Sequence, residues 1–343
     1  MNYLEKYGLD SFFTQQLIHE NISISQIAKI IAIHKKYYVS INNQGNIIKA
    51  LAKGNLLHHL AVSNADLPQI GDFIVLKNQT SQPNDDSFFI QKILQRKTIF
   101  KRKLVGKKQD VQILAVNVDY VFITMSLDHQ FNLKRLERFL LATFDSNIIP
   151  IIILTKEDLT QDPTSFTTEI TTNFPHVTSI VTSILQPLSF NPIKDLLVNN
   201  KTAVLVGVSG SGKSTITNIL LESEVQKVGA ISQEKNKGKH TTTHREIFLL
   251  KSGGCIIDSP GIKEFGLWLD NNYNLNETFA DILATAKLCK FRNCTHQNEP
   301  DCAIQAKIKT GEITQEHFNN YLYLLQEQQA ETHNITGNAK RKK

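Results

Sequence analysis

The chain has 343 residues, of which 41% are hydrophobic and 20% are charged, and its formal net charge is +6. This length predicts about two or three domains, and the hydrophobic content excludes an intrinsically disordered chain. No apolar run reaches the roughly 18 residues of a membrane-spanning helix, and the N-terminus lacks the pattern of a secretory signal. We therefore expect a cytoplasmic protein without a membrane partner.

Apolar residues spaced three and four apart predict a helical N-terminal extension over residues 1–35. From 36 to 105 the period shifts towards two, and polar turns separate short apolar runs near 36–41, 46–52, 72–77 and 87–94. Four or five strands at this spacing are typical of a small barrel or sandwich. An OB-type barrel that binds nucleic acid fits the pattern, and so do other small β folds.

Strands and helices alternate between residues 106 and 268. Predicted strands lie near 120–125, 148–154, 177–181 and 203–208, and predicted helices near 133–143, 165–172 and 193–198. All-apolar strands that alternate with helices indicate a mostly parallel sheet covered by helices on both faces. A helical domain around three cysteines is expected at 269–331 and a basic flexible tail at 332–343, so the sequence predicts a multidomain α/β protein.

A phosphate-binding loop follows the strand predicted at 203–208. Its sequence G-V-S-G-S-G-K-S-T matches the P-loop pattern and precedes an apolar helix-like run, which makes a chance glycine-rich turn a poor alternative. The loop's N–H groups and the helix N-terminus would surround the phosphates, Lys213 would reach the β- and γ-phosphates, and Ser214 would bind Mg²⁺. The predicted phosphate-binding residues are Gly207, Val208, Ser209, Gly210, Ser211, Gly212, Lys213, Ser214 and Thr215.

A second motif, D-S-P-G at 258–261, ends an apolar strand. In a P-loop enzyme such an aspartate holds Mg²⁺ and the following glycine senses the γ-phosphate. Asp258 and Gly261 are therefore predicted nucleotide-binding residues, and Asp258 is also a predicted magnesium ligand.

The segment Thr155, Lys156, Glu157 and Asp158 resembles the guanine-reading N-K-x-D segment of GTPases. A carboxylate at Asp158 can accept hydrogen bonds from the guanine N1–H and 2-amino group, and adenine has no donors at the equivalent positions. Lys156 would lie along the base. Because Thr155 stands where asparagine is usual, its link to the P-loop is expected to be weakened or differently made. Taken alone, the tetrapeptide could equally be a solvated strand end.

Thr182 and Ser183 follow a predicted strand and occupy the place of the segment that supports the guanine base. The motifs run in the order base reader, base support, P-loop and D-x-x-G, whereas an ordinary GTPase has the P-loop first. This order predicts a circularly permuted GTPase domain, in which the sheet is kept and the termini are moved.

Together these motifs resemble the circularly permuted GTPases of the RsgA type, which mature the small ribosomal subunit. The resemblance rests on T-K-E-D at 155–158, the P-loop, G-K-H-T-T-T at 238–243, D-S-P-G and the cysteine cluster, and it covers most of the chain. It implies binding of the small subunit (30S) and its rRNA, GTP hydrolysis stimulated by the subunit, and a role in late maturation.

The residue after D-S-P-G is Ile262, where many GTPases have a glutamine that orients the attacking water. Intrinsic hydrolysis is therefore expected to be slow. The family resemblance points to His240 as the catalytic residue, and Thr241 or, as we predict, Thr242 would bind Mg²⁺ in the GTP state.

Three cysteines and a histidine fall within 14 residues. This spacing predicts a closed, tetrahedral zinc site with a structural role, although buried cysteines beside an unrelated histidine would leave the same pattern. Thiolate ligands also need a reducing compartment. The predicted zinc ligands are Cys289, Cys294, His296 and Cys302.

Eight Lys and Arg residues lie between positions 92 and 108 without an acidic residue among them. A solvated face is the common explanation of such a run, but the neighbouring barrel favours RNA contact. The predicted RNA contacts are Arg96, Lys97, Lys101, Arg102 and Lys103. Two other functions stay open, a P-loop ATPase or kinase and a non-enzymatic RNA-binding adaptor, and we expect a monomer.

Overall fold

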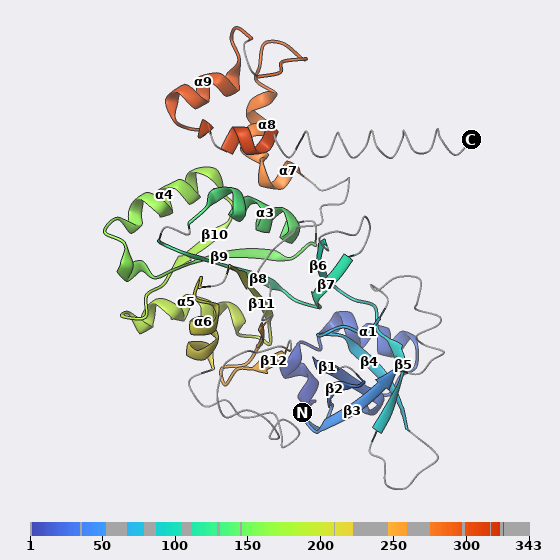
Figure 1. The fold of residues 1–343 in the computed structure, drawn as a ribbon. Coiled ribbons are helices and arrows are strands. Elements are labelled where there is room, and N and C mark those ends of the chain that lie inside the picture. Colours follow the sequence, from blue (N-terminus) through green and yellow to red (C-terminus); the bar gives the residue numbers. More distant parts are fainter. Residues whose placement is uncertain are drawn as a thin grey trace, which may run out of the picture.

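The computed structural model describes residues 2–34, 36–52, 67–78, 87–103, 111–128, 131–144, 146–208, 210–221, 246–258, 275–296, 299–315, 317–322 and 325. Figure 1 shows three parts: a barrel near the N-terminus, a sheet covered by helices, and a small helical part beyond that sheet. None of the described helices is long and apolar enough to cross a membrane.

Five strands form the barrel. They are β1 Ile27–Ile33, β2 Tyr38–Asn42, β3 Ile47–Ala52, β4 Phe73–Asn78 and β5 Ser87–Ile93. They are ordered β1-β2-β3-β5-β4, and β1 also pairs with β4, which closes the barrel. Only the β3–β5 pair in this ring is parallel. This order and closure fit the OB-type barrel that the sequence predicted.

The N-terminal extension is helical only in its first part. The structure has η1 Tyr3–Tyr7, α1 Ser11–His19 and the short η2 Ile24–Gln26, but the helix predicted after residue 21 is wrong because residues 27–33 form β1. Strand β1 pairs with β2 and β4, and its side chains are buried on both faces. Nearly every position is therefore apolar, and the alternation of apolar and polar residues that marks a half-exposed strand is lost. Even Lys29 in its middle is fully buried, and its ammonium donates to the carbonyl oxygen of Tyr7.

A hairpin of β6 Ile99–Lys103 and β7 Val111–Val116 follows the barrel and leads into the central sheet. The sequence pattern alone does not distinguish this hairpin from the neighbouring strands. The central sheet has the order β10-β9-β8-β11-β13-β12. Its strands are β8 Tyr120–Ser126, β9 Ile149–Thr155, β10 Thr178–Val181, β11 Thr202–Gly207, β12 Glu246–Leu249 and β13 Cys255–Asp258. All neighbours are parallel except β12, which runs antiparallel to β13.

Helices cover both faces of this sheet, as predicted (Figure 1). One face carries α3 Leu133–Phe144 and α4 Pro163–Asn173, and the other carries α5 Asn191–Leu197 and α6 Lys213–Leu220. Along β11, Val204 packs in the cluster that contains α3, whereas Leu205 packs in the cluster that contains α5 and α6. Alternate residues of one buried strand thus serve two hydrophobic layers. Two short 3-10 helices, η3 Glu157–Leu159 and η4 Pro187–Phe190, follow β9 and β10.

The barrel and the central sheet are hydrogen-bonded to each other. Ala32 of β1 pairs with Glu246 of β12, so the strands form one continuous eleven-stranded sheet. The C-terminal part contains α7 Leu275–Thr278, α8 Ala280–Ala286, α9 Ala303–Thr310 and a helical stretch at 317–322. It packs against α3, because Leu141 shares a buried cluster with Phe279 and Phe318.

Candidate nucleotide site and metal centre

The predicted nucleotide-binding segments follow the carboxyl ends of neighbouring parallel strands. The base-reading segment begins at the end of β9, the P-loop follows β11, and β8 lies between these two strands. Asp258 ends β13 on the other side of β11. Carboxyl ends of parallel strands lie at one edge of a sheet, which is the usual ligand-binding edge of such folds. Segments about 50 residues apart in the sequence are thereby brought to one place.

The P-loop backbone depends on its glycines. Gly207, Gly210 and Gly212 have φ angles of 148°, 82° and 93°, which disfavour residues with a Cβ. At Gly207 a Cβ atom would also lie 2.2 Å from Thr124 Oγ1, so no other residue fits there. Helix α6 begins directly after Gly212, which provides no side-chain cap. Its first N–H groups can therefore be satisfied by an anion.

Lys213 turns its ammonium back onto the loop, where Nζ donates to the carbonyl oxygens of Gly207 at 2.8 Å and Val208 at 2.6 Å. Burial lowers the pKa of Lys213, and the charge of Asp258 opposes this effect. Ser214 and Thr215 are exposed at the start of α6. The predicted residues Ser209, His240, Thr242 and Gly261 lie outside the described residues.

A hydroxyl links the base-reading segment to the P-loop. Thr155 Oγ1 donates to the carbonyl oxygen of Ser211 at 2.9 Å. The Ser211 hydroxyl, in turn, lies 2.7 Å from Thr124 Oγ1 of β8, which also donates to the carbonyl of Val206. All of these groups are buried. The link that asparagine usually makes is thus present in another form, with threonine as the donor.

The base-reading and base-supporting segments are also joined. Ser183 Oγ donates to Asp158 Oδ1 at 2.7 Å, and the N–H of Glu157 donates to the carbonyl of Thr182 at 3.3 Å. The second contact holds η3 beside the loop after β10. Asp158 lies exposed at the surface, where an incoming base can reach it. The predicted residues of the base-reading and base-supporting segments therefore lie side by side.

Sequence reasoning missed the contributions of β8 to this site. Thr124 contacts the P-loop, and Asp128, just beyond the strand, accepts a hydrogen bond from Lys156 Nζ at 2.9 Å. The available signal was positional: polar residues stand at the carboxyl end of an otherwise apolar parallel strand. Without the strand order, nothing placed β8 between the two motifs.

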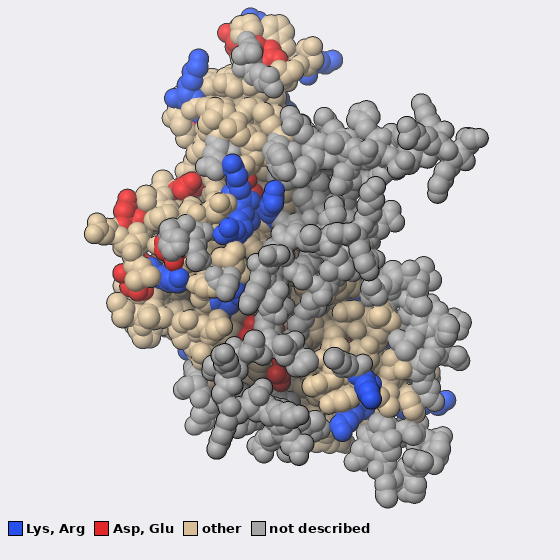
Figure 2. All heavy atoms as spheres, viewed as in Figure 1, with Lys and Arg blue, Asp and Glu red and all other residues tan. Residues whose placement is uncertain are grey.

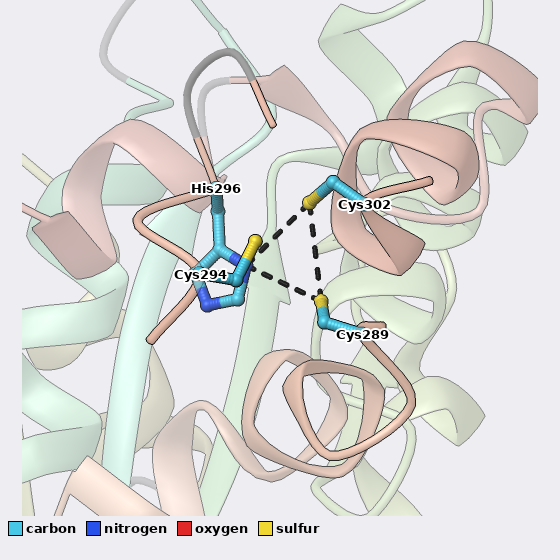
Figure 3. Close-up of side chains that lie close together, drawn as sticks. All are labelled: Cys289, Cys294, His296 and Cys302. Carbon is cyan, nitrogen blue, oxygen red and sulfur yellow. Dashed lines mark hydrogen bonds between the residues drawn. The ribbon is translucent and has the colours of Figure 1, made fainter. Parts of the chain in front are cut away.

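The four predicted zinc ligands lie together in the C-terminal part (Figure 3). His296 Nδ1 is 3.4 Å from Cys289 Sγ and 3.5 Å from Cys302 Sγ, and the two sulfur atoms are 3.9 Å apart. Zinc bonds of about 2.3 Å to sulfur and 2.0–2.1 Å to nitrogen place tetrahedral ligands roughly 3.5–3.8 Å apart. Burial lowers the pKa of His296, so the ring keeps a lone pair for a metal. This donor set fits zinc. The fourth cysteine, Cys255, is a fully buried residue of β13 and lies outside this cluster.

Two cations of the basic run after the barrel form ion pairs that the sequence does not indicate. Arg96 donates to both carboxylate oxygens of Asp72, each at 2.8 Å, and to the carbonyl of Leu67 at 2.7 Å. The Asp72 side chain is 0% exposed. Arg96 therefore has a structural role in the barrel that the sequence did not predict, and its contact with RNA stays a prediction.

The other cations of this run are placed differently. Lys97 lies 3.1 Å from Asp10 and 3.4 Å from Asp119, so the fold supplies acidic partners that the run itself lacks. Lys101 is half-buried on β6. Arg102 and Lys103 belong to the same strand, but their side chains lie outside the described residues. A second basic surface, on the outer face of α3, consists of Lys134, Arg135 and Arg138 (Figure 2).

Comparison with known proteins gives consistent matches. Residues 93–268 match the family described as RsgA GTPase. "Small ribosomal subunit biogenesis GTPase RsgA 1" of Listeria innocua is 41% identical over 94% of this chain and 89% of its own length. "Small ribosomal subunit biogenesis GTPase RsgA 2" of Vibrio parahaemolyticus is 36% identical over 95% and 86%.

Two solved structures have similar folds. YloQ, described as a circularly permuted GTPase, aligns with a TM-score of 0.60 and 25% identity, covering 89% of this chain and 95% of YloQ. YjeQ from Thermotoga maritima aligns with a TM-score of 0.62 over 88% of this chain and 98% of YjeQ. Its 19% identity carries information on the fold alone.

Proposed function

The chain belongs to the RsgA GTPase family, and from this premise we propose that it binds the small ribosomal subunit and assists its late maturation. In this role it hydrolyses GTP to GDP and phosphate, and the subunit stimulates the reaction. The relatives are named for small-subunit biogenesis and align with nearly the whole chain. The observation that carries the proposal is the Thr155–Ser211 hydrogen bond, because it joins a base-reading segment to a phosphate-binding loop in one site.

We assign the guanine base to Asp158 and Lys156, with Thr155, Glu157, Thr182 and Ser183 holding that segment in place. The phosphates are assigned to the P-loop from Gly207 to Thr215 and to Gly261. When bound, Mg²⁺ would supply charge neutralisation between the phosphates, and Ser214, Asp258 and Thr242 would hold it. Water attack is assigned to His240 as the positioning group.

The remaining assignments concern the other surfaces. We propose that the Cys₃His cluster holds one structural zinc ion and that rRNA contacts Lys97, Lys101, Arg102 and Lys103. The exposed cations of α3 support a polyanionic partner. We divide the chain into a barrel, a GTPase domain at 106–268, a zinc-binding domain at 269–331 and a tail at 332–343. The barrel now includes β1, which the sequence placed in the N-terminal extension. We propose a monomer that acts in the cytoplasm.

The decisive experiment is co-sedimentation with purified ribosomal subunits. We expect the chain to be retained on small subunits with a non-hydrolysable GTP analogue and released with GDP. Equal retention with both nucleotides, or binding to the large subunit alone, would contradict the proposal. Competition among GTP, ATP and XTP separates a GTPase from an ATPase or kinase, and the Asp158→Asn variant should shift its preference towards XTP.

Two further measurements address the reaction itself. Multiple-turnover phosphate release in the presence of small subunits would exclude a non-enzymatic adaptor that holds nucleotide only as a structural ligand. A His240→Ala variant should bind GTP normally and lose the stimulated turnover. Unchanged stimulated turnover would remove His240 from the reaction.

A further inference from the structure

A carboxylate outside every motif lies beside the guanine-reading lysine. Asp128 follows β8, and its Oδ2 atom accepts a hydrogen bond from Lys156 Nζ at 2.9 Å. Its other oxygen, Oδ1, accepts from the hydroxyl of Ser126 at 2.8 Å, and that hydroxyl belongs to a side chain with 1% exposure. The Asp128 side chain is only 16% exposed. The hydroxyl of Ser126 thus orients the carboxylate of Asp128 towards Lys156.

Lys156 needs such an anchor. Its backbone is in the left-handed region, with φ 61° and ψ 39°, at the start of η3, where its side chain makes no capping hydrogen bond. The flexible lysine stem carries about 2 kcal/mol of rotamer entropy. The contact with Asp128 fixes the ammonium, and with it the direction of the stem, at the edge of the sheet where the base is to lie. The backbone supports this arrangement, because the N–H of Leu127 donates to the carbonyl of Thr155 at 2.9 Å.

We propose that Asp128 is a positioning residue for guanine-nucleotide binding: it holds the ammonium of Lys156 so that the lysine stem is set for the base before the nucleotide arrives. This inference rests on the proposed assignment of Lys156 to the base. Removing Asp128 leaves the lysine free to adopt other rotamers, and ordering it again then reduces the affinity for nucleotide.

The position of Asp128 and Lys156 beside the base site also determines whether the pair affects nucleotide affinity or the rate of hydrolysis. GTP and GDP share the base, so the two affinities depend equally on the lysine stem. The reacting phosphates are assigned to the P-loop, whereas the contacts of Asp128 shown here are with Ser126 and with Lys156 of the base-reading segment. Asp128 therefore affects binding and leaves the rate at saturating GTP unchanged.

The test is a double-mutant cycle on the full zinc-loaded chain, with Asp128→Ala, Lys156→Ala and the double variant. Dissociation constants for GDP and for a non-hydrolysable GTP analogue are measured by displacement of a fluorescent nucleotide. We expect Asp128→Ala to weaken both nucleotides about three- to tenfold, with an unchanged rate at saturating GTP. In the Lys156→Ala background the same change should have less than about a twofold effect. Asp195→Ala, which removes an exposed carboxylate of α5, is the matched control.

The outcomes separate this inference from the assignment beneath it. If Lys156→Ala leaves both affinities unchanged, the assignment of Lys156 to the base is wrong, and the inference falls with it. If Lys156→Ala weakens binding but Asp128→Ala does not, or if the two losses add fully, Asp128 has no positioning role. Should the alanine variant fold poorly, Asp128→Asn keeps an acceptor for Lys156 and removes its charge. That variant should weaken binding by an intermediate factor, and an affinity equal to that of the Asp195→Ala control would overturn the inference.

Discussion

His317 Nδ1 lies 2.8 Å from Glu137 Oε1, and this contact joins the C-terminal helical part to α3 beside the central sheet. The two side chains are 0% and 1% exposed. The other ring nitrogen of His317 faces Asp281 of α8 at 3.3 Å. Burial lowers the pKa of His317, but the hydrogen bonds and charges of Asp281 and Glu137 outweigh this effect and raise it to about 9. A buried, positively charged imidazole thus connects two domains at neutral pH.

The stability of this connection should depend on pH. The pKa of His317 is about 9 in the folded chain and about 6.5 in an unfolded one, so protonation favours the folded state. The stabilisation is fully present below about pH 6.5 and is lost as the pH rises through about 9. We expect the free energy of unfolding of the wild type, measured in urea, to fall between pH 6.5 and 9.5.

A His317→Gln variant provides the comparison, because it cannot carry the charge. The difference in unfolding free energy between wild type and variant should shrink steadily over that pH range. His176→Gln, which makes the same change at an exposed histidine away from this contact, is the matched control. A wild-type profile parallel to that of His317→Gln would contradict the assigned protonation.

Replacement of a zinc ligand should release the metal. Cys302→Ser removes one of three sulfur ligands, and Cys302 also precedes α9 as its N-cap residue. We expect the zinc content, measured by plasma mass spectrometry, to fall from about one ion per chain to nearly none, with loss of helical signal. Metal binding and folding of such small domains are coupled. Cys255→Ser changes a cysteine outside the cluster and should keep the zinc; a Cys302→Ser protein with full zinc content would contradict the site.

The threonine in the base-reading segment can be tested by an isosteric change. Thr155→Val removes the donor to Ser211 while keeping the shape that packs against Gly212. Loss of one such buried hydrogen bond costs about 0.5–1.5 kcal/mol. If this loss destabilises the P-loop conformation that binds the phosphates, the affinity for GDP should drop roughly two- to tenfold. Thr167→Val, on the exposed side of α4, is the control, and equal affinities of the two variants would show that the link does not shape the P-loop.

Two cations of the basic run should respond differently to truncation. Arg96→Ala leaves the carboxylate of Asp72 buried without its guanidinium partner, which typically costs about 3–5 kcal/mol of stability. Lys101→Ala should reduce the salt dependence of RNA binding by about one unit of slope. Chemical denaturation and RNA titrations at several salt concentrations measure both quantities. If Arg96→Ala keeps the stability of the wild type but binds RNA more weakly, Arg96 contacts RNA and its structural role is wrong.

Much of the nucleotide site could be predicted from contiguous residues. The glycine spacing from Gly207 to Gly212 requires a loop with positive φ angles before a helix, and the structure has that loop. The alternation of apolar strands with helices predicted a sheet with two covered faces. The order of the motifs then indicated circular permutation, because the chain visits the same sheet positions in another sequence. The cluster of three cysteines and a histidine was predictable for the same reason, since its members lie within one short segment.

The sequence by itself therefore determined the local features: the glycine-rich loop before a helix, the cluster of three cysteines and a histidine, and the sheet type. Only the tertiary structure decided that residues 27–33 form a strand, that Arg96 pairs with Asp72, and that Lys156 contacts Asp128. It also decided that Thr155 contacts Ser211, 56 positions away, and that His317 contacts Glu137, 180 positions away. A strand buried on both faces carries no period, and a hydrogen bond between distant residues depends on which strands are neighbours. Both the burial of a strand and the identity of its neighbours are determined only when the whole chain has folded.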